Sequence, residues 1–438
     1  MQATDAERTE LKPAGTKLPV RIVICTADVG CGHTRAALAL RTALQTAAPQ
    51  AEVTLIEALD AAPGWFNTVY RDGYLRLIHH APRIAGWMYD ATDGKASTGG
   101  GLAPALERRA MRNLVSHPAV RGADVVVCTH FLCARVLAKC RMAGTLTAPL
   151  VVAVTDQHPH AVWLNKGADR LLVASPAAQA VAIAAGILPL RVVPTGIPID
   201  SRFAAAPDRQ TARRELGLPG DRPVVLFSGG GLGLGGIEPA VQALMASGRR
   251  VHAVAVTARN AELRGRLQRL VRAADPQRTE DGPSCEVLGF TNRMPEYLAA
   301  ADLLVGKPGG LTTAEAAAAG VPMVLVRPIP GQEERNAALL AAQGGSVLER
   351  DPARAGQLAA ELVTDAAKLQ AMRMCVRGMG RADSAAVAAA AVLSMLPPAK
   401  EEQARGKGGS GGAGGSGGVL PLEQDPHVKD LPCVCGEG

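Results

Sequence analysis

Short runs of apolar residues recur along the chain and alternate with segments of helical periodicity. In the first half these runs cover residues 20–26, 53–56, 124–128, 150–154 and 171–173. Each run has the length of a buried strand, and the Ala- and Leu-rich segments between them are typical of helices. Strands that alternate with helices predict a parallel sheet with crossover helices.

The same alternation begins again after a Pro/Gly-rich break at residues 195–200. Further apolar runs cover residues 224–227, 251–256, 285–288, 303–305 and 323–326. We therefore predict an α/β protein with two Rossmann-like domains, residues 18–200 and 201–398, whose parallel sheets face an inter-domain cleft. The last helix of the second domain is a candidate to pack back on the first. Such sheets bind ligands beyond the carboxyl ends of their strands.

The two ends of the chain differ from this pattern. Residues 1–17 are polar and are predicted to form a flexible leader, and residues 399–438 include a Gly/Ser-rich stretch that predicts a disordered tail. Nothing before the first strand has the features of a signal peptide. No uncharged apolar stretch reaches about 18 residues, so no transmembrane helix is predicted.

Composition and charge narrow the possible partners. The chain has 438 residues, of which 47% are hydrophobic and only 3% aromatic, with a net charge of +7. A basic balance suits nucleic acid or an anionic membrane surface. Nucleic acid is not favoured, because the sequence lacks an Arg/Lys-rich aromatic platform. The nine cysteines form no Cys-x-x-Cys pair, which favours a reduced cytosol. Cys433 and Cys435 are expected to be exposed tail thiols.

Residues 302–336 are the most informative segment. An apolar strand runs into a Pro-Gly-Gly turn and then a helix that begins near Thr312 and carries Glu315. Free amides at a helix N-terminus suit a phosphate, and a carboxylate one turn later suits ribose hydroxyls. A second strand then delivers a Pro-Gly-Gln-Glu loop that suits a sugar. Together these features predict a nucleotide-sugar site.

A glycine-rich loop, residues 228–236, follows the first strand of the second half. From Gly231 it matches G-x-G-x-x-G, the dinucleotide fingerprint. That fingerprint also requires an acid after the next strand, where this chain has Thr257. A phosphate-binding loop is therefore favoured over an NAD site, and a purely structural turn remains an alternative.

Polar residues also follow the strands of the first half. His33 closes the segment Asp28-Val-Gly-Cys-Gly-His and begins a helix, which suits a general base or simply a helix cap. His130 follows a later strand, and Asp156, His158 and His160 follow the next. A metal site built from these three is conceivable, but no helical His-x-x-x-His or Cys cluster supports it.

Most of the aromatic residues lie between Trp65 and Asp90, among arginines and histidines. Aromatic rings mixed with cations suit a membrane interface with anionic lipids. A helical pair that packs on its own domain is an equally good interpretation. The residues that define the candidate membrane surface are Trp65, Arg71, Arg76, Arg83 and Trp87.

Several motifs, taken in order, give the chain a family resemblance from about residue 20 to residue 396. It resembles the monogalactosyldiacylglycerol synthase and processive diacylglycerol glucosyltransferase family, relatives of the peptidoglycan enzyme MurG. The motifs are D-x-G-x-G-H at 28–33, T-H-F-L at 129–132, T-D-x-x-x-H-x-x-W at 155–163, three glycines at 229–231, G-F-x-x-x-M-P-E at 289–296, K-P-G-G-L-T-x-x-E at 307–315 and P-G-Q-E-x-x-N at 330–336.

The resemblance implies a GT-B fold and an inverting transfer, without metal or other cofactor, from a UDP-sugar to a lipid acceptor such as diacylglycerol. It implies a peripheral enzyme on the inner, cytoplasmic face of the cell membrane. By match to the family motifs, the catalytic residues are His33 and Asp28. The nucleotide-sugar residues are Gly230, Gly231, Phe290, Gly310, Leu311, Thr312, Glu315, Gln332, Glu333 and Asn336. The acceptor-side residues are Gly32, His130, Asp156 and His160.

Two departures from the family pattern lie on the acceptor side. Cys31 stands where plant members have glycine, and Thr34 stands where an arginine often follows the histidine. The residues do not choose between glucose and galactose. The alternatives are a UDP-sugar 2-epimerase, which needs no acceptor, an NAD-dependent oxidoreductase, and a nucleotide-binding module without catalysis.

Overall fold

The computed structural model describes residues 19–73, 86, 102–231, 233, 236–274, 279 and 281–396. The predicted leader and tail, with Cys433 and Cys435, lie outside these residues, as do Arg76, Arg83 and Trp87. The backbone of Arg71 is described, but its side chain is not.

The N-terminal half is built on a six-stranded parallel sheet of order β2-β1-β3-β4-β5-β6. Its strands are β1 (Arg21–Thr26), β2 (Glu52–Glu57), β3 (Val125–Cys128), β4 (Leu150–Ala153), β5 (Arg170–Val173) and β6 (Val192–Pro194). Its longer helices are α1 (Gly32–Ala47), α5 (Leu102–Ala110), α8 (Phe131–Met142) and α9 (Pro176–Ala184), with shorter turns α2 (Gly64–Asn67), η1 (Thr68–Asp72), α6 (Arg112–Ser116), α7 (Pro118–Arg121) and η2 (Pro189–Arg191). The inner strands β3 and β4 are wholly buried, as parallel strands covered on both faces require.

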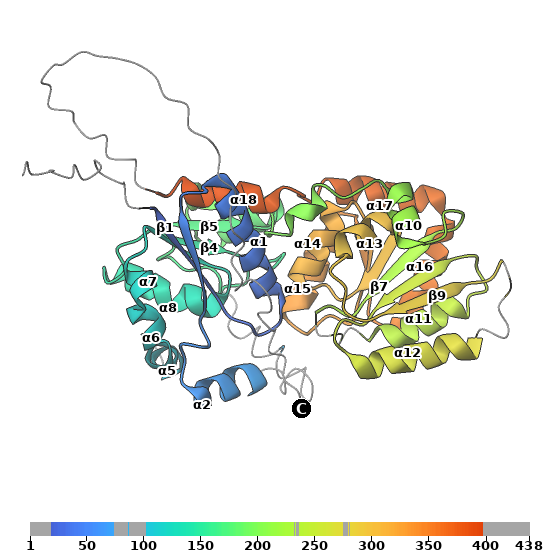
Figure 1. The fold of residues 1–438 in the computed structure, drawn as a ribbon, viewed down its shortest axis with the longest axis horizontal. Helices are drawn as coiled ribbons and strands as arrows, with labels where there is room; N and C mark the ends of the chain where they lie inside the picture. The colour runs from blue at the N-terminus through green and yellow to red at the C-terminus, as the bar shows by residue number, and fades with distance from the viewer. Residues whose placement is uncertain are drawn as a thin grey trace, which may run out of the picture.

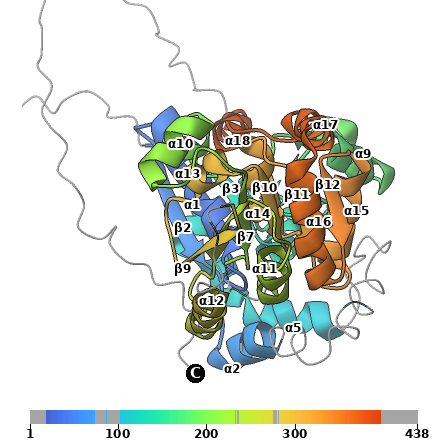
Figure 2. The same cartoon turned by 90° about the vertical axis from the view of Figure 1, so that its right-hand side faces the viewer.

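The C-terminal half repeats this design with the order β12-β11-β10-β7-β8-β9. Its strands are β7 (Val224–Ser228), β8 (His252–Val256), β9 (Ser284–Leu288), β10 (Leu303–Gly306), β11 (Met323–Val326) and β12 (Ser346–Glu349). Its helices are α10 (Arg209–Leu216), α11 (Ile237–Met245), α12 (Ala261–Ala274), α13 (Met294–Ala300), α14 (Gly310–Ala318), α15 (Gln332–Ala342), α16 (Pro352–Thr364) and α17 (Ala366–Arg377). Residues of α11, α12 and α16 share a core with one face of the sheet, and those of α13 and α14 with the other (Figure 2).

The two halves lie side by side and are joined at two places (Figure 1). The segment after β6 crosses between them, with Ile197 and Ile199 buried. The last described helix, α18 (Ser384–Leu393), packs against α1 of the N-terminal half, where Ala388, Ala389 and Val392 are buried.

The predicted α/β architecture of two parallel sheets is confirmed, with two strands that the apolar runs did not indicate. β6 is three residues long and ends in Pro194, and β12 reads Ser-Val-Leu-Glu. Both are edge strands, one at the end of each sheet. Edge strands are half solvated and therefore carry fewer apolar residues than the runs used for the prediction.

Candidate functional site

His33 lies at the second position of α1, directly after the loop that follows β1. Its Nδ1 is 3.1 Å from the carbonyl oxygen of Thr129 and 2.6 Å from Oγ1 of Thr155. A carbonyl only accepts, so Nδ1 carries the proton and Nε2 is the basic nitrogen. Burial lowers the pKa of His33, whereas the carboxylates of Asp156 and Asp28 and the Thr129 carbonyl act in the opposite direction. The imidazole is thus held in the neutral form that a base requires.

The carboxylate of Asp28 bonds to the loop that precedes His33 and to the first turn of α1. Its Oδ1 accepts hydrogen bonds from the backbone N–H of Cys31 at 3.3 Å and from the hydroxyl of Thr34 at 3.4 Å. Cys31 is the N-cap of α1 and has φ of 62°. That left-handed conformation is costly for a residue other than glycine, so Asp28 fixes a strained turn that presents His33.

His130 begins α8 and packs edge-on against His33, with ring centroids 4.5 Å apart. Its Nδ1 accepts a 3.1 Å bond from the backbone N–H of Leu132. Burial, followed by the neighbouring His33, holds the pKa of His130 well below its ordinary value. Phe131 and Trp163 complete an aromatic wall around the two imidazoles.

Asp156, just beyond β4, is the polar centre of the contact between the halves. Its Oδ1 accepts a 2.6 Å hydrogen bond from Nε2 of Gln332 and lies 3.5 Å from Nδ2 of Asn336. Its Oδ2 accepts from the indole of Trp163 at 2.8 Å. The sequence-predicted acceptor-side Asp156 and donor-side Gln332 and Asn336 are thus brought together.

The N-terminus of α14 also meets the first half. A side chain at Gly310 would place its Cβ 1.9 Å from the carbonyl oxygen of Thr155, so only glycine fits. Beside it, Nε2 of Gln157 donates to the carbonyl of Gly310 at 3.3 Å and to Oγ1 of Thr313 at 3.1 Å. Leu311 is buried, and Gly32 faces its Cβ. Thr312 follows on the same turn.

Glu315 lies one turn further along α14 and is also engaged by the first half. Its Oε1 accepts a 2.7 Å bond from the guanidinium of Arg35 on α1. The Glu315 side chain is 3% exposed. Burial raises the pKa of Glu315, and the positive charge of Arg35 opposes that shift.

Glu333, at the second position of α15, is held within the C-terminal half. Lys307 lies 3.2 Å from its Oε1, and the backbone N–H of Ile329 donates to its Oε2 at 2.7 Å. Burial raises the pKa of Glu333, and Lys307 lowers it. Its carboxylate therefore shapes the loop before α15.

The glycine loop after β7 lies opposite the His33 loop. Gly230, Gly233 and Gly236 have φ between 60° and 72°, which explains glycine there. A Cβ at Gly231 would lie 3.0 Å from the Cβ of Cys31, so the two loops lie against each other.

Phe290 follows β9 and is 68% exposed. Its ring lies 5.6 Å from the guanidinium carbon of Arg259. Within the described residues its ring contact is with Arg259, not with another residue predicted for the site.

His160 is fully buried, and its Nδ1 accepts a 3.1 Å bond from the backbone N–H of Val162. The carboxylate of Asp156 is likewise engaged, as described above. Across the residues that the structure describes, no group of three or more His, Cys, Asp or Glu side chains is arranged to hold a metal ion.

The described part of the candidate membrane surface lies on α2 and η1. Trp65 is 50% exposed and Val69 is 67% exposed, whereas Phe66 is buried and stacks on Tyr70. One aromatic pair of this segment therefore packs inward and Trp65 faces outward, and the membrane role of the segment stays a prediction. No helix in the described ranges is long and apolar enough to span a bilayer.

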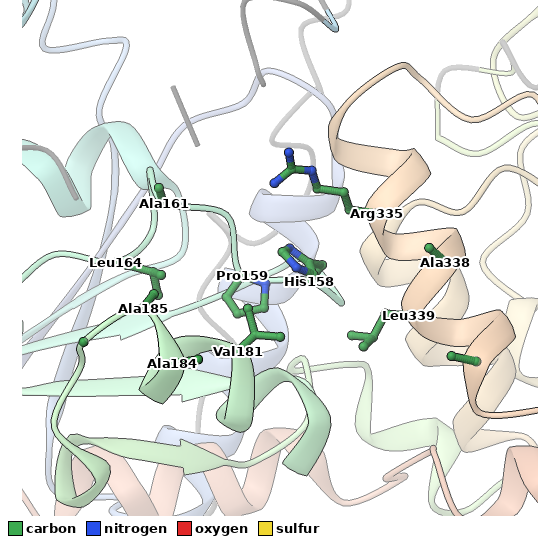
Figure 3. Close-up of a pocket in the computed structure, with 12 residues that line it drawn as sticks. His158, Pro159, Ala161, Leu164, Val181, Ala184, Ala185, Arg335, Ala338 and Leu339 are labelled. Atoms are coloured by element: carbon green, nitrogen blue, oxygen red, sulfur yellow. The ribbon is translucent and has the colours of Figure 1, made fainter. Parts of the chain in front are cut away.

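A cavity of about 930 Å³ adjoins the site between the two halves. Figure 3 shows His158 and Pro159 on one side and Arg335, Ala338 and Leu339 of α15 on the other. The backbone N–H of His158 donates to Oδ1 of Asn336 at 2.9 Å, which connects this cavity to the Asp156 cluster.

Sequence reasoning missed two residues that join the halves, Arg35 and Gln157. Gln157 lies inside the T-D-x-x-x-H-x-x-W motif, so its position gave a signal. Arg35 gave none, because a single charged residue on a helix is usually solvated.

Two family models match the chain. Residues 33–199 match the monogalactosyldiacylglycerol (MGDG) synthase family, and residues 266–386 match the glycosyltransferase family 28 C-terminal domain. Among curated proteins, the chain is 27% identical over 228 residues to a processive diacylglycerol beta-glucosyltransferase of Staphylococcus epidermidis and 28% identical over 238 residues to one of Bacillus cytotoxicus. These alignments cover 52% and 54% of this chain and 56% and 60% of those proteins.

Solved structures share the fold. Acinetobacter baumannii MurG superposes with a TM-score of 0.55 at 18% identity, over 86% of this chain and 100% of that one. The UDP-GlcNAc 2-epimerase of Neisseria meningitidis has a TM-score of 0.53 at 10% identity, over 86% and 99%. The fold alone therefore does not separate transferases from epimerases, but the family models do. The expected resemblance is confirmed: on a GT-B fold, the first half of the chain matches the MGDG synthase model and the second half matches the glycosyltransferase family 28 C-terminal model.

Proposed function

We propose that the chain is an inverting glycosyltransferase that moves a hexose from a UDP-sugar to a membrane lipid, with diacylglycerol as the first candidate acceptor. One residue, Thr155, carries this proposal. Its hydroxyl holds His33, and its carbonyl abuts Gly310 at the start of α14. A neutral imidazole and a helix N-terminus suited to a diphosphate therefore both contact a single residue.

His33 is the general base in this proposal. Nε2 takes the proton of the acceptor hydroxyl, and the hydroxyl oxygen attacks the anomeric carbon. The bond from that carbon to the diphosphate breaks, and its electron pair leaves with UDP. The proton then passes from the imidazolium to solvent. A positioned base of this kind contributes roughly 10²–10⁴ in rate.

The departing diphosphate is stabilised by backbone groups. The amides of Gly230 and Gly231 and those of Leu311 and Thr312 are assigned as hydrogen-bond donors, and α14 adds its dipole. The Gly230 amide, which donates to Oγ of Ser228 at 3.3 Å in the structure, turns to the diphosphate when UDP-sugar binds. This gives the chain a route to leaving-group stabilisation without a metal ion. One well-aimed donor is worth roughly 10²–10³ in rate.

Glu315, Gln332 and Asn336 are assigned to the ribose and sugar of the donor, and Phe290 to the uracil. In the structure the first three bond to the N-terminal half, through Arg35 and Asp156. Gln332 therefore exchanges its bond to Asp156 for the sugar when the donor binds.

The acceptor side supports a lipid. The curated relatives are named as diacylglycerol glucosyltransferases, and the exposed Trp65 and Val69 offer an apolar contact to a bilayer. We assign the protein to the inner face of the cell membrane, docked without a spanning helix.

The rival functions are less well supported. An epimerase shares the fold, but the two family models that match this chain are those of a synthase and a glycosyltransferase. An NAD-dependent oxidoreductase requires a ribose acid after β8, where Thr257 instead donates to the carbonyl of Leu288 at 2.8 Å.

Titration calorimetry with UDP tests the donor half of the proposal. We expect wild-type protein to bind UDP and Glu315→Gln to bind it at least about tenfold more weakly, because a buried carboxylate that accepts ribose hydroxyls is lost. Equal affinity of the two proteins would refute the assignment of Glu315.

A further inference from the structure

Arg35 reaches from the acceptor half to the residue assigned to the donor ribose. It lies two residues after His33 on α1, and its guanidinium bonds to Glu315 across 280 residues of sequence at 2.7 Å. The arginine side chain is 46% exposed, whereas that of Glu315 is 3% exposed. Arg35 is thus a solvent-accessible cation placed on a buried carboxylate.

The groups around Glu315 leave Arg35 as its cationic partner. The carboxylate of Asp200 in the linker raises the pKa of Glu315, as burial does, and Arg35 lowers it. Asp200 is itself bound by Arg202 at 2.7 Å. Two further helices pack on α14. On α13, Glu296 lies 4.0 Å from Arg293, and on α17, the side chain of Arg377 lies beside Gly320, just beyond the C-terminus of α14.

The geometry leaves room for a ligand at this pair. Arg35 uses one oxygen of Glu315, and a carboxylate has about four acceptor positions on two oxygens. A cavity of about 190 Å³ adjoins the pair, lined by Arg35, Asp200, Ser201, Leu311 and Glu315 among others. Two ribose hydroxyls can therefore bond to Glu315 without displacing Arg35.

We propose that Arg35 is a positioning residue of the donor site, which fixes the carboxylate of Glu315 for the ribose hydroxyls. The inference rests on the proposed function and extends it, because it makes donor affinity depend on the acceptor half. Arg35 and His33 both lie on α1. The bond between Arg35 and Glu315 therefore also fixes the position of His33 relative to the ribose site.

The test is UDP affinity by calorimetry from about pH 8 to about pH 6 for the wild type, Arg35→Gln, Arg35→Lys and Glu315→Gln. Without Arg35 the pKa of Glu315 rises. As the pH is lowered, the carboxylate is therefore protonated, and UDP affinity lost, at a higher pH than in the wild type. We expect Arg35→Gln to bind UDP roughly three- to tenfold more weakly near neutral pH, with a larger ratio at the acid end. Arg35→Lys restores most of the affinity. The ionisation of UDP is common to all four proteins and cancels in the ratios.

The control is Arg121→Gln on α7, which removes the same charge at an exposed site and leaves UDP affinity unchanged. Adding Arg35→Gln to Glu315→Gln has no further effect on UDP affinity if the two residues act as one unit.

Two results would overturn the inference. Tighter UDP binding by Arg35→Gln would show that Arg35 competes with ribose, and unchanged UDP binding would show that Arg35 has no effect on the donor site. If Glu315→Gln binds UDP as wild type does, the proposed donor site itself is wrong. Should Arg35→Gln not fold, Arg35→Met replaces it as the variant without the charge, and Arg35→Lys remains the variant that keeps it.

Discussion

Asp156, at the carboxyl end of β4, accepts a 2.6 Å hydrogen bond from Gln332, the first residue of α15. The two residues belong to different sheets and are 176 positions apart in sequence. Their bond brings the acceptor-side loop of one half onto the sugar-side loop of the other. Among the charged groups near His33, Asp156 has the strongest effect in favour of the protonated imidazole. The same carboxylate therefore acts on the proposed base and bonds to Gln332 of the other half.

Replacing His33 by glutamine removes the proposed base while keeping a polar side chain. We expect kcat to fall by roughly 10²–10⁴, because proton removal from the acceptor hydroxyl is no longer assisted. UDP affinity should change by less than about threefold, as expected for a residue without a donor role. Steady-state kinetics and calorimetry together check this. The matched control is His117→Gln, at the N-cap of α7; a loss of UDP affinity with normal turnover in His33→Gln would contradict the assignment.

The pH profile reports the same imidazole. Burial lowers the pKa of His33, and the base must be neutral, so kcat should fall only as the pH drops below about 6.5. The charge of Asp156 raises the pKa of His33, and Asp156→Asn should therefore move the acid limb to lower pH. Rates at saturating donor from about pH 5 to about pH 8 measure the limb. A shift to higher pH in Asp156→Asn would contradict this electrostatic account.

Gly310→Ala tests the contact between the halves. The added methyl group meets the carbonyl oxygen of Thr155 at 1.9 Å, and both partners are backbone. We expect transfer activity to fall at least about tenfold, because the distance between His33 and the N-terminus of α14 increases. Small-angle scattering should show a larger radius of gyration. Gly265→Ala on α12, where a Cβ makes an ordinary 3.6 Å contact, serves as the control. Wild-type activity in Gly310→Ala would mean that this closed contact has no role in catalysis.

Trp65→Ser tests the membrane surface. A half-exposed tryptophan that enters the headgroup region adds apolar contact to the bilayer, so its loss should lower the bound fraction several-fold in flotation with anionic vesicles. Leu190 on η2 is 94% exposed and lies on another part of the N-terminal half; Leu190→Ser is therefore a matched control. Equal losses in both variants would argue against a specific docking surface at α2.

Most strands could be predicted from the sequence because buried parallel strands are continuous apolar runs. β6 and β12 were not predicted because they are short edge strands with polar or proline ends. The motif residues were placed correctly at strand ends, since parallel strands share a carboxyl edge.

The contacts between the two halves could not be predicted from the sequence in the same way. Arg35 meets Glu315, and Asp156 meets Gln332, only because the two sheets face each other. No periodicity within a segment encodes a contact between residues so far apart. The hydrogen bond from the backbone N–H of Cys31 to Asp28, at a turn with positive φ, is likewise visible only in the structure, and the catalytic role expected for Asp28 stays a prediction.

The most direct measurement is a product assay with purified protein, anionic vesicles that contain diacylglycerol, and UDP-glucose, UDP-galactose or UDP-GlcNAc in turn. The account predicts that one donor yields a glycosylated lipid and an equal amount of UDP, that omission of diacylglycerol stops both, and that His33→Gln forms neither. Conversion of the donor without an acceptor, or no glycolipid from any of the three donors, would contradict it.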